Sequence, residues 1–221
     1  VAQTVNTDIR LIGRDFEVEA GTEGWTYHGR ERTLGPLPEP GILGLHQRDN
    51  AAVALALLEA VEPQALAVTQ TLGTALAGVR LGGRLECRRD DRDVEWVLDV
   101  AHNPAAAATL AEWLKQAPTR RTRAVFAMLR DKDARAVAAV MSPCVDTWYL
   151  AGLTGPRGQS AGELSTRIAG AISPPILWDN IAEAIAHAVR DARPSERIVV
   201  LGSFHTLAQA LASGLIPRGS R

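Results

Sequence analysis

The sequence has 221 residues, a formal net charge of −1 and 46% hydrophobic residues. This length can hold one large domain or two small ones, and a charge near zero gives no field that would attract nucleic acid. No apolar run approaches the ~18 residues of a membrane span, and we find no signal peptide, so we expect no membrane partner. Cys87 and Cys144 lack metal-ligand spacing, and we expect reduced thiols in the cytoplasm.

The first part of the chain predicts a small sheet followed by two helices. Short apolar pieces at 9–12, 16–19 and 25–27 are separated by glycines, which predicts an antiparallel meander within residues 8–34. A connection rich in Pro and Gly follows at 35–44. Two helices are then expected, one from His46 through the alanine-rich run that Asn50 opens, and one from Pro63 to about Leu76.

The pattern changes after Gly82 and Gly83, where short apolar strands begin to alternate with helical segments. Such alternation predicts βαβ units and a mainly parallel sheet. We expect strands at 85–88, 94–100, 123–128, 145–151, 175–178 and 197–202, and helices at 105–116, 133–140, 160–172, 180–191 and 205–212.

We therefore divide the chain into residues 1–79, residues 80–213 and a polar tail at 214–221, which is either native or derived in part from an expression vector. Because the chain starts at Val1 in what we interpret as the middle of a domain, we also expect it to be part of a longer protein.

Polar residues follow four of the expected parallel strands. In an open α/β sheet, ligands bind at the carboxyl ends of the strands, so these residues predict a ligand site at one edge. The clusters are 99–103, 128–133, 151–158 and 202–205. At the first of them, a capped helix is the alternative explanation, with Asn103 as the N-cap and Pro104 at the first helical position.

The sequence D-V-A-H-N-P at 99–104 resembles the signature of folylpolyglutamate synthases, including the bacterial bifunctional dihydrofolate synthases. These enzymes are ATP-dependent amide ligases of the same group as the Mur enzymes. Other pieces resemble the family in the same order, although Gly82 stands where the family often has proline. They are G-R-D-F at 13–16, H-Q-R-D-N-A-A at 46–52, G-R-L-E at 83–86, M-L-R-D-K-D at 128–133, G-P-R-G at 155–158 and G-S-F-H-T at 202–206.

The resemblance implies a Rossmann-like, mainly parallel six-stranded sheet flanked by helices, which is the glutamate ligase domain of Mur-type enzymes. The tail end of the central ATP-binding domain, a small β-meander plus two helices, would precede it. The implied reaction activates a folate carboxylate with ATP as an acyl phosphate, which the amine of glutamate attacks. ATP, Mg²⁺, L-glutamate and dihydropteroate or folate are the implied cofactors and partners, and the full-length protein would be monomeric.

The two lysines limit what these residues can do alone. Lys115 and Lys132 are the only lysines and neither follows a glycine, so a phosphate loop G-x-x-x-x-G-K-[ST] is absent from the 221 residues. We expect the phosphate loop and the metal ligands in the other half of the family's sequence. The 221 residues alone are therefore expected to be inactive.

The resemblance gives three residues a role at the nucleotide. Asn50 would hydrogen-bond the adenine, Arg84 would contact the nucleotide and couple domain closure to its binding, and Asp99 would bind the ribose hydroxyls. Each has a structural alternative: an N-cap for Asn50, a solvated surface position for Arg84 and a turn-stabilising role for Asp99.

Three further residues are candidates at the reacting groups and the amino acid. His102 would meet the phosphates or the tetrahedral intermediate, or orient the amino acid, and a structural histidine is its alternative. Ser203 and Arg157 would bind the glutamate carboxylates, because a hydroxyl at a strand-to-helix turn and a guanidinium both suit carboxylates.

Three other classes of protein are compatible with parts of the pattern. A Mur-type peptidoglycan ligase shares the architecture, although the G-P-R-G and G-S-F-H-T pieces favour the folate enzymes. A non-catalytic nucleotide- or ligand-binding module is the second alternative. A dehydrogenase is a poor third, because Gly152, Gly155 and Gly158 lack the spacing G-x-G-x-x-G and Pro156 interrupts them.

Overall fold

The computed structural model describes residues 8–44, 46–116 and 121–218. The chain divides into two compact units, Val1–Leu81 and Gly82–Arg221, each with its own hydrophobic core. Every helix in the described ranges is too short or too polar to cross a membrane.

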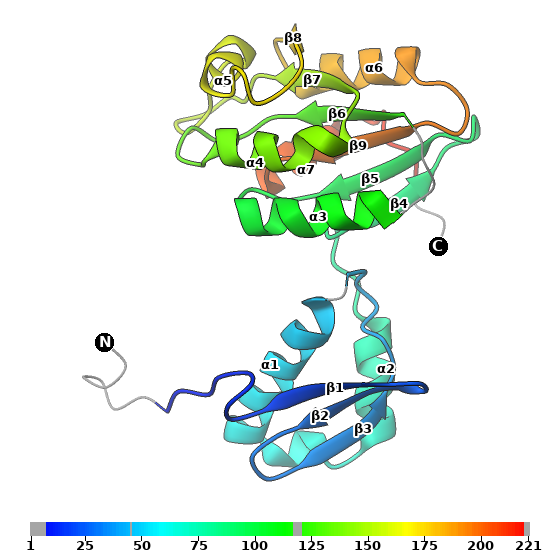
Figure 1. The fold of residues 1–221 in the computed structure, drawn as a ribbon. Coiled ribbons are helices and arrows are strands. Elements are labelled where there is room, and N and C mark those ends of the chain that lie inside the picture. The colour runs from blue at the N-terminus through cyan, green and yellow to red at the C-terminus, as the bar shows by residue number, and fades with distance from the viewer. Residues whose placement is uncertain (1–7, 45, 117–120, 219–221) are drawn as a thin grey trace. The chain divides into compact units, whose positions relative to one another are not determined.

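The first unit is a three-stranded antiparallel sheet with helices packed on it (Figure 1). The strands β1 (Glu17–Gly21), β2 (Gly24–His28) and β3 (Thr33–Leu37) are ordered as in the chain. Helix α1 (His46–Val61), a 3₁₀ turn (Pro63–Leu66) and helix α2 (Thr69–Gly78) follow. The core between them is built on Trp25, Tyr27 and Leu37 from the sheet and Leu55 from α1, all almost fully buried.

The meander is confirmed, but its members differ from those expected. The piece at 9–12 makes only an isolated bridge between Ile12 and Phe16, and the third strand is Thr33–Leu37. That strand contains Pro36, which the sequence pattern placed in a connection; an edge strand tolerates proline because one side of its backbone has no partner strand. The helix expected from Pro63 is also wrong, because the 3₁₀ turn there is separate from α2.

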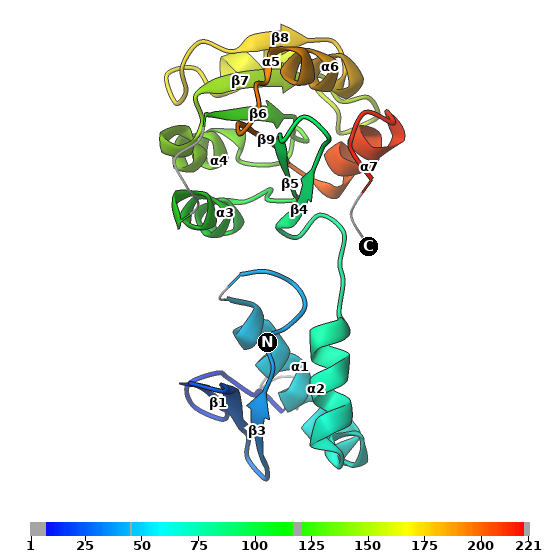
Figure 2. The same cartoon turned by 90° about the vertical axis from the view of Figure 1, so that its right-hand side faces the viewer.

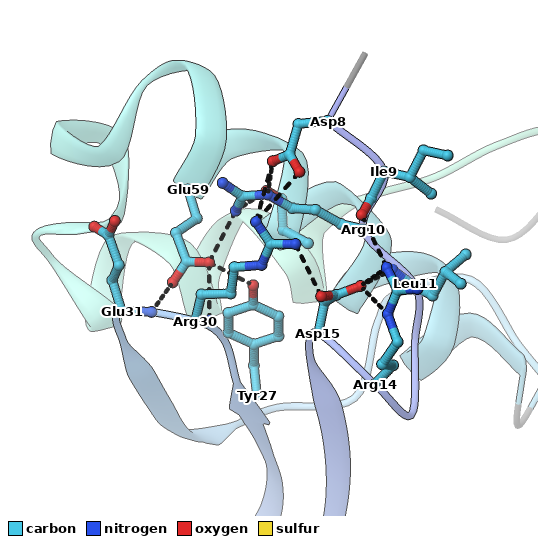
Figure 3. Close-up of polar contacts among 11 residues, drawn as sticks. Asp8, Ile9, Arg10, Leu11, Arg14, Asp15, Tyr27, Arg30, Glu31 and Glu59 are labelled. Carbon is cyan, nitrogen blue, oxygen red and sulfur yellow. Dashed lines mark hydrogen bonds and ion pairs between the residues drawn. The ribbon is translucent and has the colours of Figure 1, made fainter. Parts of the chain in front are cut away.

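A buried carboxylate ties α1 to the loop between β2 and β3 (Figure 3). The Glu59 side chain is 1% exposed and accepts from Nη1 of Arg10 at 3.1 Å. It also accepts from the hydroxyl of Tyr27 and from the backbone amides of residues 30–32, at 3.1 to 3.3 Å. Burial and the adjacent Glu59 raise the pKa of Tyr27 to about 12. A buried carboxylate with this many donors has its charge compensated on all sides.

The G-R-D-F piece forms the neighbouring turn shown in Figure 3. Oδ2 of Asp15 accepts from the Leu11 amide at 2.9 Å and from the guanidinium of Arg14, and Oδ1 accepts from Arg30 at 2.8 Å. Hydrogen bonds from Arg14 and Arg30 hold the pKa of Asp15 well below its usual range. This piece therefore has a structural function in the first unit.

The second unit is an α/β fold with a six-stranded sheet in the order β4-β5-β9-β6-β7-β8. Every neighbouring pair is parallel except β4 with β5, as expected for a mainly parallel sheet. The strands are β4 (Glu86–Arg89), β5 (Glu95–Asp99), β6 (Thr122–Phe126), β7 (Thr147–Ala151), β8 (Ile176–Trp178) and β9 (Arg197–Leu201). The helices are α3 (Pro104–Gln116), α4 (Ala134–Met141), α5 (Ala161–Arg167), α6 (Ile181–Asp191) and α7 (Phe204–Ala212), with a 3₁₀ turn at Ser142–Cys144.

Helices cover both faces of this sheet (Figure 2). Helices α3, α4 and α5 share one core with Val97, Phe126 and Val199, whereas α6 and α7 share the other with Leu98 and Val200. Neighbouring residues of one strand enter opposite cores because side chains alternate along a strand. A sheet buried on both faces explains why its strands are apolar runs with little alternation.

Two elements of this unit end differently from the expectation. Helix α5 ends at Arg167, whereas the sequence pattern extended it to residue 172; Gly170 has a φ of +76°, which an α-helix does not accommodate. The segment expected to be a polar tail is partly core, since Ile216 is 8% exposed and Pro217 O accepts from Nη1 of Arg88 at 2.8 Å. Residues 219–221 lie outside the described ranges.

Candidate functional site

Asp99 ends β5 at the carboxyl edge of the sheet and is 6% exposed. Its Oδ2 accepts from the backbone amide of Leu85 at 2.8 Å, and its Oδ1 accepts from the amide of Ala101 at 2.7 Å. Both oxygens therefore hold turns of the chain.

The turn that carries Arg84 is tightly held. Its two neighbours adopt left-handed conformations, with φ of +76° at Gly83 and +46° at Leu85. Gly83 O accepts from the Val100 amide at 2.9 Å, and a β-carbon at Gly83 would lie 2.4 Å from Cδ2 of Leu207. Only glycine fits at position 83. At position 85, the left-handed backbone conformation is held by burial of the Leu85 side chain and by the hydrogen bond from its amide to Asp99.

The Arg84 side chain lies against an aromatic ring. Its guanidinium carbon is 5.3 Å from the centroid of Phe204, the first residue of α7. Within the described ranges the guanidinium makes no hydrogen bond and no ion pair. A half-buried arginine with unused donors can bind an anion.

His102 lies in the turn between β5 and α3 and is half-buried. Its Nδ1 is 2.9 Å from the carbonyl oxygen of Val100, which can only accept, so Nδ1 carries the proton. This fixes the ring and leaves Nε2 as an acceptor in the neutral form and a donor in the protonated form. The capped helix also exists, because Asn103 Oδ1 accepts from the Ala106 amide at 2.9 Å.

Ser203 is the N-cap of α7 and is 6% exposed. Its Oγ accepts from the Thr206 amide at 3.1 Å and lies 2.8 Å from Oγ1 of Thr206, which in turn donates to Ala127 O at 2.8 Å. Since the Thr206 hydroxyl has one proton, Ser203 must be the donor between the two hydroxyls. Donation from Ser203 to a ligand carboxylate would require its hydroxyl to leave Thr206.

Arg157 follows β7 and its side chain is 66% exposed. Its Nη1 lies 3.6 Å from Oδ2 of Asp131. Gln159, which the sequence pattern did not single out, holds the surrounding loops. Its Nε2 donates to Met128 O at 2.7 Å, and its Oε1 accepts from Nη1 of Arg167 at 2.9 Å. Nothing in the sequence pattern signals Gln159, because its contacts with Met128, 31 positions away, and with Arg167, eight positions away, are not made within one helix or strand.

The sheet order decides which candidates lie together. Arg84, Asp99, His102 and Ser203 come from the start of β4 and the ends of β5 and β9, which are neighbours. Arg157 is at the same edge but follows β7, with β6 between it and β9. Helix α1 starts at His46 as expected, so the N-cap alternative for Asn50 is wrong: Asn50 lies inside the helix, and its Nδ2 donates to Gln47 Oε1 at 3.0 Å.

A metal site is not part of this arrangement. Among the residues that the structure describes, no three His, Cys, Asp or Glu side chains are placed to hold an ion. The donors at this edge are a guanidinium and an imidazole, which suit an anionic ligand better than a cation.

The second unit is an α/β protein fold whose mainly parallel sheet gathers a guanidinium, an imidazole and a buried acid at its carboxyl edge, which is where α/β proteins of this kind bind ligands. The family model "Mur ligase, glutamate ligase domain" matches residues 83–204, and the chain belongs to this family.

Among curated proteins, the dihydrofolate synthase/folylpolyglutamate synthase of Escherichia coli is 34% identical over 96% of this chain and 47% of its own length. The solved structure of E. coli FolC in complex with ADP has a TM-score of 0.79 at 32% identity, covering 96% of this chain and 49% of that one. A bifunctional folylpolyglutamate synthase/dihydrofolate synthase with Mn, AMPPNP and L-glutamate bound has a TM-score of 0.81 at 30% identity, covering 97% of this chain and 50% of that one. The chain thus spans about half the length of the relatives that it matches.

Proposed function

We propose that this protein is an ATP-dependent ligase of folate metabolism that joins L-glutamate to dihydropteroate or to a folate. The observation that carries the proposal is the edge formed by Arg84, Asp99 and His102, in a fold similar to enzymes solved with nucleotide and L-glutamate. ATP supplies the phosphoryl group that activates a carboxylate for attack by an amine. Such chemistry requires positioning and charge neutralisation more than covalent help from the protein.

Each residue of this edge has a proposed role that follows from the chemistry of its side chain. Arg84 neutralises phosphate charge, Asp99 accepts from the ribose hydroxyls, and Nε2 of His102 hydrogen-bonds the phosphates or the tetrahedral intermediate. Arg157 and Ser203 bind the carboxylates of glutamate. For Asn50, which belongs to the first unit, the adenine contact that the family resemblance implies stays a separate prediction. Mg²⁺ would bind to residues outside the edge described above, since its donors suit anions.

The 221 residues supply a binding edge but no phosphate loop. We expect the purified chain to bind ADP and L-glutamate weakly and to show no ATP hydrolysis or glutamate incorporation. Titrations followed by ¹⁵N NMR test the binding, with signals of Arg84 and His102 expected to move with ADP. If neither ligand moves any signal of the second unit, the proposed function is wrong. Glutamate incorporation by these residues alone would contradict the expected inactivity.

The identity of the amino acid separates the folate enzymes from the related peptidoglycan ligases. We expect L-glutamate to shift signals around Arg157 and Ser203, and diaminopimelate to leave them unchanged at the same concentration. The reverse result would favour a Mur-type peptidoglycan ligase.

A further inference from the structure

Phe204 is exposed at the carboxyl edge of the sheet. It is the first residue of α7, directly after the cap Ser203, and 54% of it is exposed. A single exposed aromatic residue needs no explanation by itself. Here, however, the guanidinium carbon of Arg84 lies 5.3 Å from the ring centroid, within the ~6 Å at which a cation–π contact forms.

Helix α7 holds both the backbone and the side chain of the Arg84 turn. Leu207 packs so closely on Gly83 that a β-carbon there would be 2.4 Å from Cδ2. Phe204 lies one helical turn earlier on α7, where residues three apart share a face. The hydrogen bond from the Leu85 amide to Asp99 fixes the other side of the turn.

The kind of contact determines what Arg84 can still bind. A carboxylate partner would neutralise the guanidinium and occupy its donors. A cation–π contact with a ring face needs no hydrogen-bond acceptor, so it leaves the N–H donors of the guanidinium available for a ligand. Within the described ranges Arg84 has the ring contact and no carboxylate.

We propose that Phe204 is a positioning residue that holds the guanidinium of Arg84 at the carboxyl edge of the sheet, ready to bind the phosphates of a nucleotide. The inference rests on the proposed function, which supplies the nucleotide as the ligand. It adds Phe204, whose aromatic ring, rather than its apolar area, positions Arg84.

The test uses the 221-residue chain with ADP as the probe and the Arg84 Nε–Hε signal as the readout. Phe204→Leu keeps an apolar side chain and removes the ring, whereas Phe204→Trp keeps a ring. We expect Phe204→Leu to shift the Arg84 signal of the free protein and to weaken ADP binding about two- to fivefold, as one exposed cation–π contact would. Phe204→Trp should bind ADP within twofold of wild type. Leu211→Ala, which removes another exposed apolar side chain of α7, should change neither quantity.

The outcomes separate this inference from the proposed function. If ADP moves the Arg84 signal in wild type but Phe204→Leu binds ADP equally well, the inference alone is overturned. Equal weakening in the Leu and Trp variants also overturns it, because the ring would then not be the cause. If ADP leaves the Arg84 signal of wild type unmoved, the nucleotide contact of the proposed function fails, and this inference fails with it.

Discussion

The carboxylate of Asp99 and the backbone amide of Leu85 are joined by a hydrogen bond of 2.8 Å, which ties the end of β5 to the turn that carries Arg84. The same carboxylate holds the Ala101 amide, two residues before Asn103. Asp99 thus has a structural function whether or not it also binds a ribose.

Replacing Asp99 by alanine leaves two buried amides without their acceptor. We expect the free energy of unfolding of the second unit to fall by about 1–3 kcal/mol for each amide, measured by urea denaturation. Asp91→Ala is the matched control, because Asp91 is exposed. If Asp99→Ala weakens ADP binding at full stability, the carboxylate acts on the ligand and not through the turn.

Two variants distinguish the role of the Ser203 hydroxyl from that of the Thr206 hydroxyl. Ser203→Ala removes the cap of α7 and should cost about 1 kcal/mol of stability. It should also weaken L-glutamate binding, seen as smaller NMR shifts on titration. Thr206→Val removes the acceptor of the Ser203 proton and should leave glutamate binding intact. Equal weakening in both variants would mean that the start of the helix, rather than the serine hydroxyl, matters to glutamate.

Glu59 accepts hydrogen bonds from five donors in the core of the first unit. Glu59→Gln places an amide nitrogen among five donors and leaves Arg10 without its charge partner, which should cost roughly 3–5 kcal/mol. Chemical denaturation followed by signals of the first unit measures this. Glu62→Gln, one turn further at an exposed position, should be neutral; similar effects of the two variants would refute the assigned role.

The two tyrosines report folding at alkaline pH. The pKa of Tyr27 is raised to about 12, and burial raises that of Tyr149 as well, whereas an unfolded tyrosine ionises near ~10. A raised pKa in the folded state means stability that is complete below pH ~10 and lost as the pH rises towards ~12. Absorbance at 295 nm should therefore show little ionisation at pH 10 in the native protein and about half in urea. Tyr27→Phe should remove the native ionisation near pH 12, and ionisation of the native protein near pH 10 would contradict the prediction.

Ile216 tests whether the end of the chain belongs to the second unit. Ile216→Ala removes a buried side chain from the core with α6 and α7 and should cost stability at the low end of about 2–5 kcal/mol. Leu215→Ala, at a neighbour that is 43% exposed, should stay within about 0.5 kcal/mol. Equal effects would place Ile216 outside the core.

The fold of the second unit could be predicted because its strands are short apolar runs between helices of ordinary length. The elements that could not be predicted depend on contacts between distant residues. Pro36 lies in an edge strand only because β2 is its neighbour, and Ile216 is apolar but follows Gly214 in a stretch without periodicity. The site was predicted as residues at strand ends, and the sheet order then places three strands, β5, β9 and β6, between β4, which Arg84 precedes, and β7, which Arg157 follows.

Residue types alone could not show which candidate side chains already form hydrogen bonds or ion pairs within the protein. Ser203 and Asp99 are both engaged by backbone amides, while Arg84 is not engaged by any acid in the described ranges. Phe204 was visible only as part of the G-S-F-H-T piece, because a ring that packs on an arginine 120 positions away leaves no local pattern.

The antiparallel direction of β4 has a consequence for how the second unit is joined to the first. Had β4 run parallel to the other strands, the chain would arrive from Leu81 at the opposite, amino-terminal edge of the sheet. Its reversal instead brings the arriving chain to the edge that holds Asp99, His102 and Ser203. The segment that joins the two units therefore enters the second unit at the candidate site, with Gly83 and Arg84 directly after Gly82 in the chain.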